Sequence, residues 1–336
     1  MHIVSPIAQK SGAYRVHNLL ECHLPDYCVK AFNPYWTVFP PILPAVVSLK
    51  GADLIHSTPD YAVFFYLTSV PLVITFHGYV IDGRLSPYSS WLQNLHHITD
   101  LRLWTRLALR KAHTITAVSE YLATHIREDL GISQSIKVIY NGVDINCFSP
   151  ERFEDSFRNE IRVFFPGNLT RRKGAHFLPS IANLLKKNVS IFYTKGFRGR
   201  NFLSSNPRLK CMKSVPFETM PDCYRYMDIL LVPSVREGFG LTIAEAMACG
   251  LPVVASNCSA IPELIENEKG GFLCPVGDVN AFAEKINVLA DSPKLRREMG
   301  EYNRAKVERL FVLERMVSQY KELFESIMDD KKHIRG

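Results

Sequence analysis

Short apolar runs alternate with stretches of helical periodicity along most of this chain. A short apolar run between polar residues is typical of a buried strand, and apolar residues that recur every three or four positions are typical of an amphipathic helix. On this basis we predict strands in the first part of the chain at 2–5, 27–31, 53–57, 72–77, 113–119 and 137–141.

The same alternation begins again after 149–152, a polar stretch without periodicity. Strand and helix in alternation predict a parallel sheet with helices on both faces. The fold class is therefore α/β, with two doubly wound Rossmann-like domains joined by a linker. The strands predicted for the second domain lie at 162–166, 189–194, 210–215, 229–233, 252–256 and 271–274.

The most apolar run, at 61–76, does not predict a membrane span. It is shorter than the ~20 residues with which a helix crosses a bilayer, and Pro71 divides it. A helix followed by a strand is the better interpretation.

Length and charge narrow the class of protein. A chain of 336 residues suits two domains of about 150 residues each. The formal net charge of +7 favours an anionic partner, which could be a nucleotide sugar, an acidic lipid surface or a nucleic acid. Charge alone does not choose among these partners.

The eight cysteines form no CxxC pair and no regular framework, and the sequence shows no signal peptide. Both features favour reduced thiols in the cytoplasm. Cys22, His23 and Cys28 lie close together in the sequence, but no second ligand pair follows at zinc spacing. We therefore expect a cytoplasmic protein with no obligatory metal and no cofactor.

One segment, 236–250, carries the strongest chemical signal. It places Glu237 and Glu245 eight residues apart across a turn that contains Gly238 and Gly240. A glycine-rich turn that opens a helix brings backbone N–H groups close to a ligand and favours phosphate, which we expect near 240–243. The two carboxylates would then face hydroxyl groups on either side of the phosphate.

A purely structural interpretation of Glu245 is also open at this point. Thr242 and Glu245 match a capping box, in which the glutamate only satisfies a backbone N–H group at the start of the helix. The spacing of the residues does not decide between the two interpretations.

The wider segment resembles a known signature. Glu237-Gly238-Phe239-Gly240, then 245–250, then 252–256 are together similar to the E-x7-E signature of the retaining glycosyltransferases of family 4, which have the GT-B fold. The resemblance implies that two Rossmann-like domains face each other across a cleft that contains the active site. It divides the chain into an acceptor-side domain at 1–149, a nucleotide-sugar-binding domain at 150–311, and a helix with a tail at 312–336 that crosses back to the first domain.

The resemblance also assigns roles in the cationic turn after the strand at 162–166. Lys173 matches the family's lysine before glycine and, with Arg172, would stabilise the departing diphosphate, which gains negative charge as the glycosidic bond breaks. Asn168 stands where family members usually carry an arginine, and Arg172, or else Arg171, would supply that charge. The alternative is that both arginines are solvated surface charges.

The family's other site positions match elsewhere in the chain. His77, at the end of the strand at 72–77, matches the histidine at the reaction centre and would contact the transferred sugar. Gly12 resembles the glycine loop near the donor phosphates, and Val215 lies where the family's backbone reads the base. In a later loop, Ser259 replaces one of two glycines that the family carries.

Together these matches imply transfer of a hexosyl unit from a nucleoside diphosphate sugar to an acceptor hydroxyl, with retention at the anomeric carbon. No Asp-x-Asp occurs, which argues against the metal-dependent class of glycosyltransferases. Glu237 would bind the transferred sugar and Glu245 the ribose diol, in polysaccharide, lipopolysaccharide or glycolipid assembly. The implied catalytic residues are His77, Lys173, Arg172 and Glu237, and the implied donor-binding residues are Gly12, Asn168, Lys173, Val215, Glu237, Gly238, Phe239, Gly240, Leu241, Thr242 and Glu245.

A basic helix suggests a further partner. The helix predicted at 101–111 carries Arg102, Arg106 and Arg110 along one face. Such a helix can lie on an anionic membrane, here at the inner face, if the acceptor is linked to a lipid. The alternative is an ordinary solvated helix face. We expect no nucleic-acid partner.

Three other classes of protein are alternatives to a glycosyltransferase. A nucleotide-sugar epimerase of the same fold would convert the donor without an acceptor, and a catalytically impaired sugar-binding protein would fit Asn168. A nicotinamide dehydrogenase needs a G-x-G-x-x-G motif after an early strand, and the glycine pairs at 238–240 and 196–199 lack that arrangement.

Overall fold

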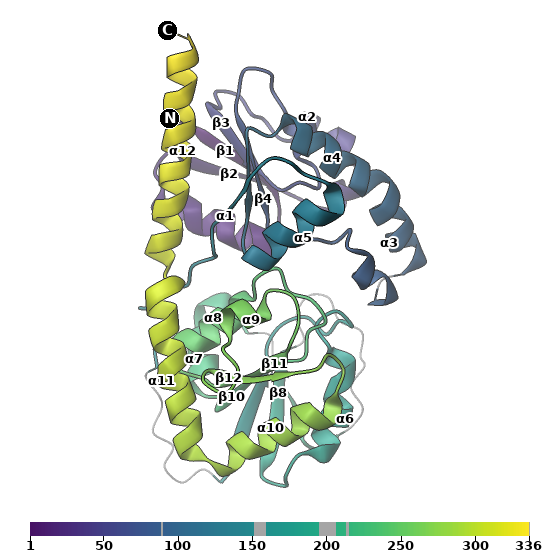
Figure 1. Ribbon diagram of the computed structural model, residues 1–336, viewed down its shortest axis with the longest axis vertical. Coiled ribbons are helices and arrows are strands. Elements are labelled where there is room, and N and C mark those ends of the chain that lie inside the picture. Colours follow the sequence, from purple (N-terminus) through teal and green to yellow (C-terminus); the bar gives the residue numbers. More distant parts are fainter. Residues whose placement is uncertain (89, 151–158, 195–205, 213–214, 336) are drawn as a thin grey trace. The chain divides into compact units, whose positions relative to one another are not determined.

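The computed structural model describes residues 1–88, 90–150, 159–194, 206–212 and 215–335 (Figure 1). The chain forms two compact units, one made of Met1–Asn141 with Glu314–Gly336 and the other of Gly142–Leu313. Each unit contains one six-stranded sheet in which all the paired strands are parallel.

The sheet of the first unit has the strand order β2-β1-β3-β4-β5-β6. Its strands are β1 (Ile3–Ala8), β2 (Tyr27–Phe32), β3 (Leu54–Ser57), β4 (Leu72–Phe76), β5 (Thr114–Ala117) and β6 (Ile136–Val138). The α-helices of this unit are α1 (Gly12–His23), α2 (Leu43–Val46), α3 (Trp91–His96), α4 (Arg102–Lys111), α5 (Glu120–Leu130) and α12 (Leu313–Arg335).

The sheet of the second unit has the strand order β12-β11-β10-β7-β8-β9. Its strands are β7 (Ile161–Phe165), β8 (Val189–Thr194), β9 (Leu209–Met212), β10 (Ile229–Val232), β11 (Val253–Ser256) and β12 (Gly271–Cys274). The helices are α6 (Leu178–Leu184), α7 (Met220–Arg225), α8 (Leu241–Ala248), α9 (Ile261–Leu264), α10 (Val279–Asp291) and α11 (Pro293–Leu310).

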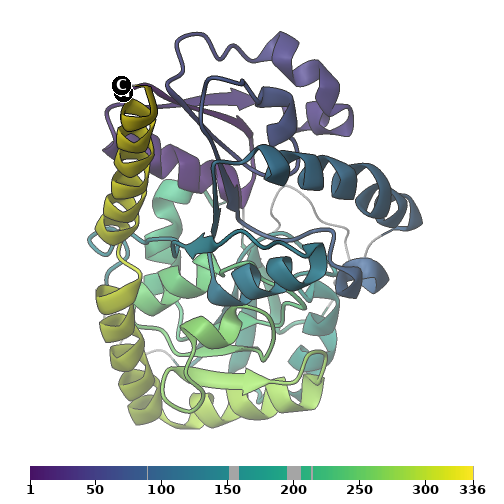
Figure 2. The same cartoon turned by 45° about the horizontal axis from the view of Figure 1, so that its top comes forward.

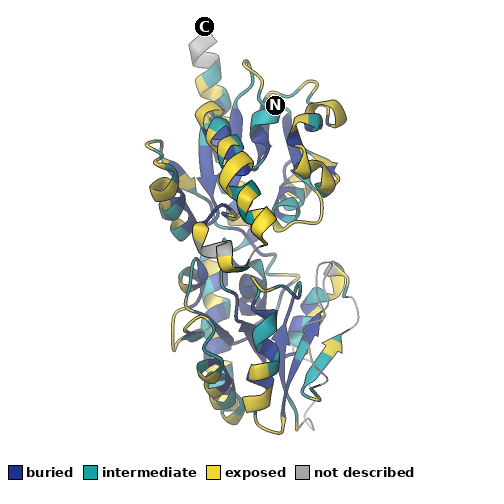
Figure 3. Cartoon of the chain, turned by 90° about the vertical axis from the view of Figure 1, so that its right-hand side faces the viewer, coloured by how far each residue is buried: buried dark blue, intermediate teal, exposed yellow. Residues whose placement is uncertain are grey.

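Burial explains why the strands read as continuous apolar runs. Every residue of β4, β10 and β11 is buried. In Figure 3 the inner strands of each unit are coloured as buried, whereas the helices carry many exposed residues. Parallel sheets that helices cover on both faces have this pattern, so the predicted α/β fold class is confirmed.

Local capping signals set the ends of several helices. At α5, the Ser119 side chain accepts a hydrogen bond of 3.2 Å from the N–H of Leu122, and Gly131 ends the helix in the left-handed conformation at φ +64°. Ser119 is thus the N-cap of α5, and Gly131 supplies the left-handed C-terminal end.

A few predicted elements differ from the observed ones. The strand predicted at 137–141 ends earlier, at Val138. The strand predicted at 210–215 corresponds to β9 (Leu209–Met212), and 213–214 lie outside the described residues. The apolar run at 61–76 contains a 3-10 helix (Ala62–Phe65) followed by β4, as expected. Part of the predicted linker, from 151 on, and the glycine pair at 196–199 lie outside the described residues.

The C-terminal helix belongs to the first unit. In Figures 1 and 2, α12 runs beside α1. Tyr320 and Phe324 of α12 pack on the ring of His56 in β3, with ring centroids 5.3 and 5.4 Å away. Helix α12 continues to Arg335, through most of the segment predicted as a helix with a tail at 312–336.

The strand orders place the ligand-binding edges. In an open α/β sheet, ligands bind at the carboxyl ends of the strands, where the strand order reverses. β1 lies between β2 and β3, and β7 lies between β10 and β8, so the strand order reverses at β1 and at β7. The residues that follow β1, β3 and β4 in the first unit, and β7 and β10 in the second, therefore lie at the candidate ligand-binding edges.

Candidate active site

An ion pair joins the two loops that follow β7 and β10. Lys173 Nζ lies 2.6 Å from Glu237 Oε1, and the Ser234 hydroxyl donates to the same oxygen at 2.7 Å. Arg172 lies on the same side, with its Nη1 3.9 Å from Glu237 Oε2. Because β7 and β10 are neighbours, their carboxyl ends bring these residues together. Three of the four predicted catalytic residues, Arg172, Lys173 and Glu237, are thus in one cluster.

The charge state of Glu237 follows from this cluster. Its side chain is buried, and burial alone would raise the pKa of the carboxyl group. The charges of Lys173 and Arg172, with the hydrogen bonds from Lys173 and Ser234, outweigh burial and hold the pKa of Glu237 below its usual value. Glu237 is therefore a carboxylate at neutral pH, which can accept hydrogen bonds from hydroxyl groups.

The backbone holds the two loops together tightly. Gly174 adopts φ +74°, and a Cβ atom on it would lie only 2.0 Å from the carbonyl oxygen of Pro233. The N–H of Val235 donates to the Arg172 carbonyl at 2.9 Å, and Arg172 Nη1 donates to the Arg236 carbonyl at 3.1 Å. Glycine at position 174 is thus required for both its conformation and its close approach.

Helix α8 begins directly after this cluster. Its N-cap is Gly240, at φ +105°, and no side chain caps it. Thr242 is the second residue of the helix and not its N-cap, so the capping-box interpretation of Thr242 and Glu245 is wrong. The first turn, with Leu241 and Thr242 half-buried, presents the positive end of the helix dipole.

Glu245 and Phe239 are more deeply buried than their predicted roles suggest. Glu245 is 1% exposed, and its Oε2 accepts a hydrogen bond of 2.8 Å from the Tyr224 hydroxyl. Phe239 is 2% exposed and packs edge-on against Phe311. Phe239 therefore fixes the turn through the core, while Gly238 beside it is half-buried. The donor contacts predicted for these residues stay predictions.

Asn168 and Val215 lie on other parts of the same unit. Asn168 follows β7 in the turn that carries Lys173, and its carbonyl accepts from the N–H of Thr170 at 2.8 Å. Val215 is half-buried and lies just before a 3-10 helix (Phe217–Thr219). The contacts predicted for them with the diphosphate and the base stay predictions.

In the first unit, His77 and Gly12 follow β4 and β1. Gly12 is the first residue of α1, where Ser11 caps the helix by accepting from the N–H of Tyr14 at 2.9 Å. A Cβ atom on Gly12 would meet nothing within 4 Å. Burial lowers the pKa of His77 to about 3, so its imidazole is neutral at physiological pH.

Comparisons with known proteins cover both units. Residues 160–292 match the family model described as glycosyl transferases group 1, and residues 1–146 match the model of glycosyltransferase family 4. The chain belongs to the group 1, or family 4, glycosyltransferases. The enzyme is thus a glycosyltransferase, which confirms the resemblance seen in the sequence.

Among the curated relatives of this glycosyltransferase is N-acetyl-alpha-D-glucosaminyl L-malate synthase of Bacillus anthracis. The two are 25% identical over 333 residues, which cover 92% of this chain and 84% of the relative. The capsular polysaccharide biosynthesis glycosyltransferase CapM of Staphylococcus aureus is 25% identical over 254 residues, which cover 69% of this chain and 66% of the relative.

Solved structures show the same fold as this glycosyltransferase. Sucrose-phosphate synthase of Thermosynechococcus elongatus matches with a TM-score of 0.83 and 18% identity, covering 98% of this chain and 100% of that one. HepE of Anabaena, solved in complex with UDP and glucose, matches with a TM-score of 0.81 and 22% identity, covering 97% and 100%. The GT-B fold is therefore confirmed.

The structure gives roles or properties to two residues of the glycosyltransferase for which the sequence predicted none. Ser259 adopts φ +50°, a region that favours glycine, and its hydroxyl accepts from the N–H of Glu237 at 2.9 Å. Asp60, just after β3, is half-buried, and burial raises its pKa to about 6, although His96 lowers it slightly. A position just after a predicted strand was the signal that could have indicated Asp60.

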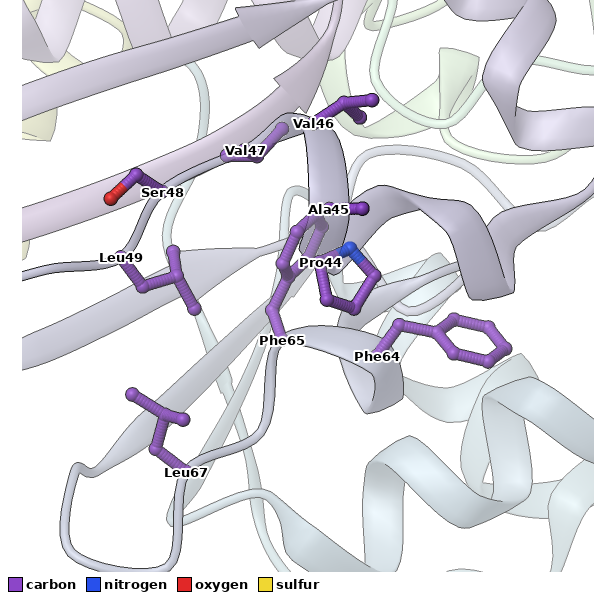
Figure 4. Close-up of a pocket in the computed structure, with 9 residues that line it drawn as sticks. All are labelled: Pro44, Ala45, Val46, Val47, Ser48, Leu49, Phe64, Phe65 and Leu67. Carbon is purple, nitrogen blue, oxygen red and sulfur yellow. The ribbon is translucent and has the colours of Figure 1, made fainter.

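A cavity of about 440 Å³ lies elsewhere in the first unit (Figure 4). Leu49 and Leu67, which line it, precede β3 and β4, so the cavity lies toward the amino ends of these strands. The carboxyl ends carry His77. No predicted site residue lines this cavity, whose walls are formed by Pro44, Ala45, Val46, Val47, Ser48, Leu49, Phe64, Phe65 and Leu67.

One arginine of the predicted basic helix, Arg102 of α4, is paired within the first unit. Arg102 forms an ion pair of 3.1 Å with the Asp129 carboxylate and donates to the Asp129 carbonyl at 3.0 Å. Within the described residues, no helix has the length and apolar character that crossing a membrane requires.

Proposed function

We propose that this glycosyltransferase moves a hexosyl unit from a nucleoside diphosphate sugar to an acceptor hydroxyl, with retention and without a metal. The observation that carries the proposal is the Lys173–Glu237 pair, which lies directly before the uncapped start of α8. A cation, a carboxylate and a helix N-terminus in one place suit a ligand that has both phosphates and sugar hydroxyls.

The chemistry assigns each group a task. The bond from the anomeric carbon to the donor phosphate oxygen breaks, and a bond to the acceptor oxygen forms on the same face of the sugar. The acceptor proton passes to the departing phosphate oxygen, so no protein base is needed. Lys173 and Arg172 offset the negative charge that gathers on the diphosphate, while Glu237 binds hydroxyls of the transferred sugar.

The nature of the substrates draws on the relatives. HepE of Anabaena was solved with UDP-glucose, and CapM of Staphylococcus aureus and AmsK of Erwinia amylovora are named as capsular polysaccharide and amylovoran biosynthesis glycosyltransferases. We therefore propose a UDP-hexose as the first donor to test and a growing polysaccharide or glycolipid as the acceptor class.

A turnover screen tests this function. Purified protein is incubated with UDP-, GDP- and ADP-sugars, with and without a cell-lipid extract, and nucleotide release is measured. Glu237→Ala and Lys173→Ala should abolish release from the accepted donor. Lys210→Ala is the matched control, since it breaks another lysine–glutamate pair of the same unit, with Glu160, and should leave release unchanged.

The alternative functions give different results in the same screen. Isomerisation of the donor without nucleotide release would identify an epimerase. Binding of the donor without turnover in any acceptor mixture would identify a catalytically impaired sugar-binding protein.

We also propose that the first unit contacts an anionic membrane on the cytoplasmic side. Helices α3 and α4 form one helical stretch through a π-helical turn (His97–Leu101). Trp91 and Ile98 on this stretch are 72% and 69% exposed, and Leu92 and Leu95 are also exposed. Their spacing places them on one side of the helix, next to the arginines of α4.

Flotation with liposomes tests this contact. Wild-type protein should float with vesicles that contain anionic lipid and not with neutral ones, and a double substitution, Trp91→Glu with Ile98→Glu, should abolish flotation. Arg106→Glu with Arg110→Glu should weaken it, whereas Arg102→Gln should have little effect because Arg102 is paired with Asp129. Flotation that none of these changes alters would contradict the proposal.

A further inference from the structure

A buried polar network crosses the core of the first unit and ends at His77. His77 Nε2 lies 3.0 Å from Nε2 of His17, a buried residue of α1. On its other side, His17 Nδ1 lies 2.6 Å from the Ser5 hydroxyl and 2.9 Å from the Tyr27 hydroxyl. The Tyr27 hydroxyl also lies 2.7 Å from His56 Nδ1.

The network continues from His56 through two threonines. His56 Nε2 lies 2.6 Å from the Thr75 hydroxyl, which lies 2.6 Å from the Thr116 hydroxyl. The Thr116 hydroxyl in turn donates to the carbonyl oxygen of Ile74 at 3.5 Å. Tyr320 of α12 closes this end, with its hydroxyl 3.4 Å from that of Thr75.

The carbonyl of Ile74 sets the direction of these hydrogen bonds. A carbonyl only accepts, so Thr116 donates to it and must accept from Thr75. The Thr75 hydroxyl donates its one proton to Thr116, so it must accept a hydrogen bond from His56. His56 is then protonated at Nε2, and its Nδ1 accepts the proton of the Tyr27 hydroxyl.

The same reasoning reaches His77 through His17. Because the Tyr27 proton points at His56, the Tyr27 oxygen accepts from His17, which carries its proton on Nδ1 and shares it with the Ser5 oxygen 2.6 Å away. His17 Nε2 is then an acceptor, and His77 must donate to it from Nε2–H. Burial, and for His17 and His56 also the neighbouring imidazoles, lowers the pKa of all three histidines, so each carries a single ring proton.

We propose that Tyr27, His56 and His17 are positioning residues that hold His77 as its Nε2–H tautomer, so that His77 Nδ1 accepts a hydrogen bond from a hydroxyl of the transferred sugar. Nδ1 of His77 is buried and has no hydrogen-bond partner among the described residues. An unpaired buried acceptor costs free energy, which a sugar hydroxyl would recover by donating to it. The sugar contact rests on the function proposed above, whereas the tautomer does not.

The tautomer can be measured without any substrate. In a long-range ¹H–¹⁵N spectrum of the full-length protein labelled with ¹⁵N-histidine, Nδ1–H and Nε2–H tautomers give different patterns. The His77 signal is assigned by its loss in His77→Gln. We expect Nε2–H for His77 and His56 and Nδ1–H for His17. An Nδ1–H or a cationic His77 near pH 7 would overturn the proposal.

Two substitutions that each remove one hydroxyl beside His17 form a matched pair. Tyr27→Phe breaks the link to His56, so His77 should lose its single tautomer and kcat/KM for the donor should fall about tenfold, as for one lost hydrogen bond. Ser5→Ala leaves that link intact, so the tautomer should stay and kcat/KM should change by no more than about twofold.

The outcomes separate the network from the proposed function. Equal losses in Tyr27→Phe and Ser5→Ala, or a retained His77 tautomer in Tyr27→Phe, would overturn the positioning role. If Tyr27→Phe does not fold, Thr75→Val interrupts the same path, and the wild-type spectrum still decides the tautomer. If no donor is turned over, the proposed function fails, and the spectrum alone then decides the tautomer.

Discussion

Lys173 Nζ and Glu237 Oε1 lie 2.6 Å apart, although the two residues are 64 positions apart along the chain. The charge of Lys173 helps to hold the pKa of Glu237 below its usual value, although the Glu237 side chain is buried. A donor that carries phosphates and hydroxyls would exchange part of this mutual contact for contacts of its own, so the pair should matter for turnover as well as for folding.

Replacing Glu237 by glutamine tests this pair. Glu237→Gln keeps the shape but removes the charge that balances Lys173, so we expect kcat to fall roughly tenfold to a hundredfold. The free energy of unfolding should fall by about 1–3 kcal/mol. Nucleotide release and chemical denaturation measure the two effects. Glu160→Gln is the control, because its pair with Lys210 is partly exposed and should contribute no more than about 1 kcal/mol.

Gly174→Ala should lower the stability of the protein far more than Gly131→Ala does. Both glycines have positive φ angles, +74° and +64°, so both substitutions strain the backbone by about 1 kcal/mol. Only at Gly174 would the new Cβ collide, 2.0 Å from the carbonyl oxygen of Pro233, while at Gly131 it meets nothing within 4 Å. Melting temperatures measure the difference, and equal losses for the two variants would contradict the close approach of the loops after β7 and β10.

The conformation of Ser259 gives an ordered pair of variants. Ser259→Ala loses the hydroxyl that accepts from the N–H of Glu237 and keeps the strained φ of +50°. Ser259→Gly loses the same hydrogen bond but relieves the strain, so it should be more stable than the alanine variant by about 1 kcal/mol. Denaturation curves decide the order, and an alanine variant that equals the glycine variant would show that the strain is absent.

Stability of the first unit should fall as the pH drops below about 6.5. His17, His56 and His77 have lowered pKa values because they are buried, so the unfolded chain binds protons that the folded chain does not. As the pH falls, each of these histidines should lower the free energy of unfolding by about 1.4 kcal/mol per pH unit. For His77 this loss should continue down to about pH 3. Burial raises the pKa of Asp60 to about 6, so between roughly pH 6 and 4 its carboxyl group binds a proton more readily in the folded state. This uptake offsets the loss of unfolding free energy from one histidine.

His77→Gln is the check on this pH dependence. Denaturation at pH 7.0, 6.0 and 5.0 should show a smaller loss of unfolding free energy for the variant than for the wild type, because one buried imidazole has been removed. An identical loss would mean that His77 is not buried in its neutral form.

Much of the architecture could be predicted because its causes are local in the chain. Apolar runs indicated the strands, and Ser119 and Gly131 mark the ends of α5 through their own capping chemistry. The glycine turn before α8 and the candidate site residues Lys173 and Glu237 could also be predicted from the sequence. Where a local pattern allowed two interpretations, as with Thr242 and Glu245, only the position of the N-cap decided between them.

The fold class, the family and most of the predicted donor-site residues could be inferred before any coordinates, because periodicity, turn chemistry and motif order are local properties of the chain. The pairing of side chains could be seen only once the chain was folded. Ser259 reaches Glu237, and Tyr27 reaches both His17 and His56, because parallel strands bring together residues that lie far apart in sequence. No spacing pattern in the sequence encodes such pairs. The tautomer proposed for the His77 ring follows from them.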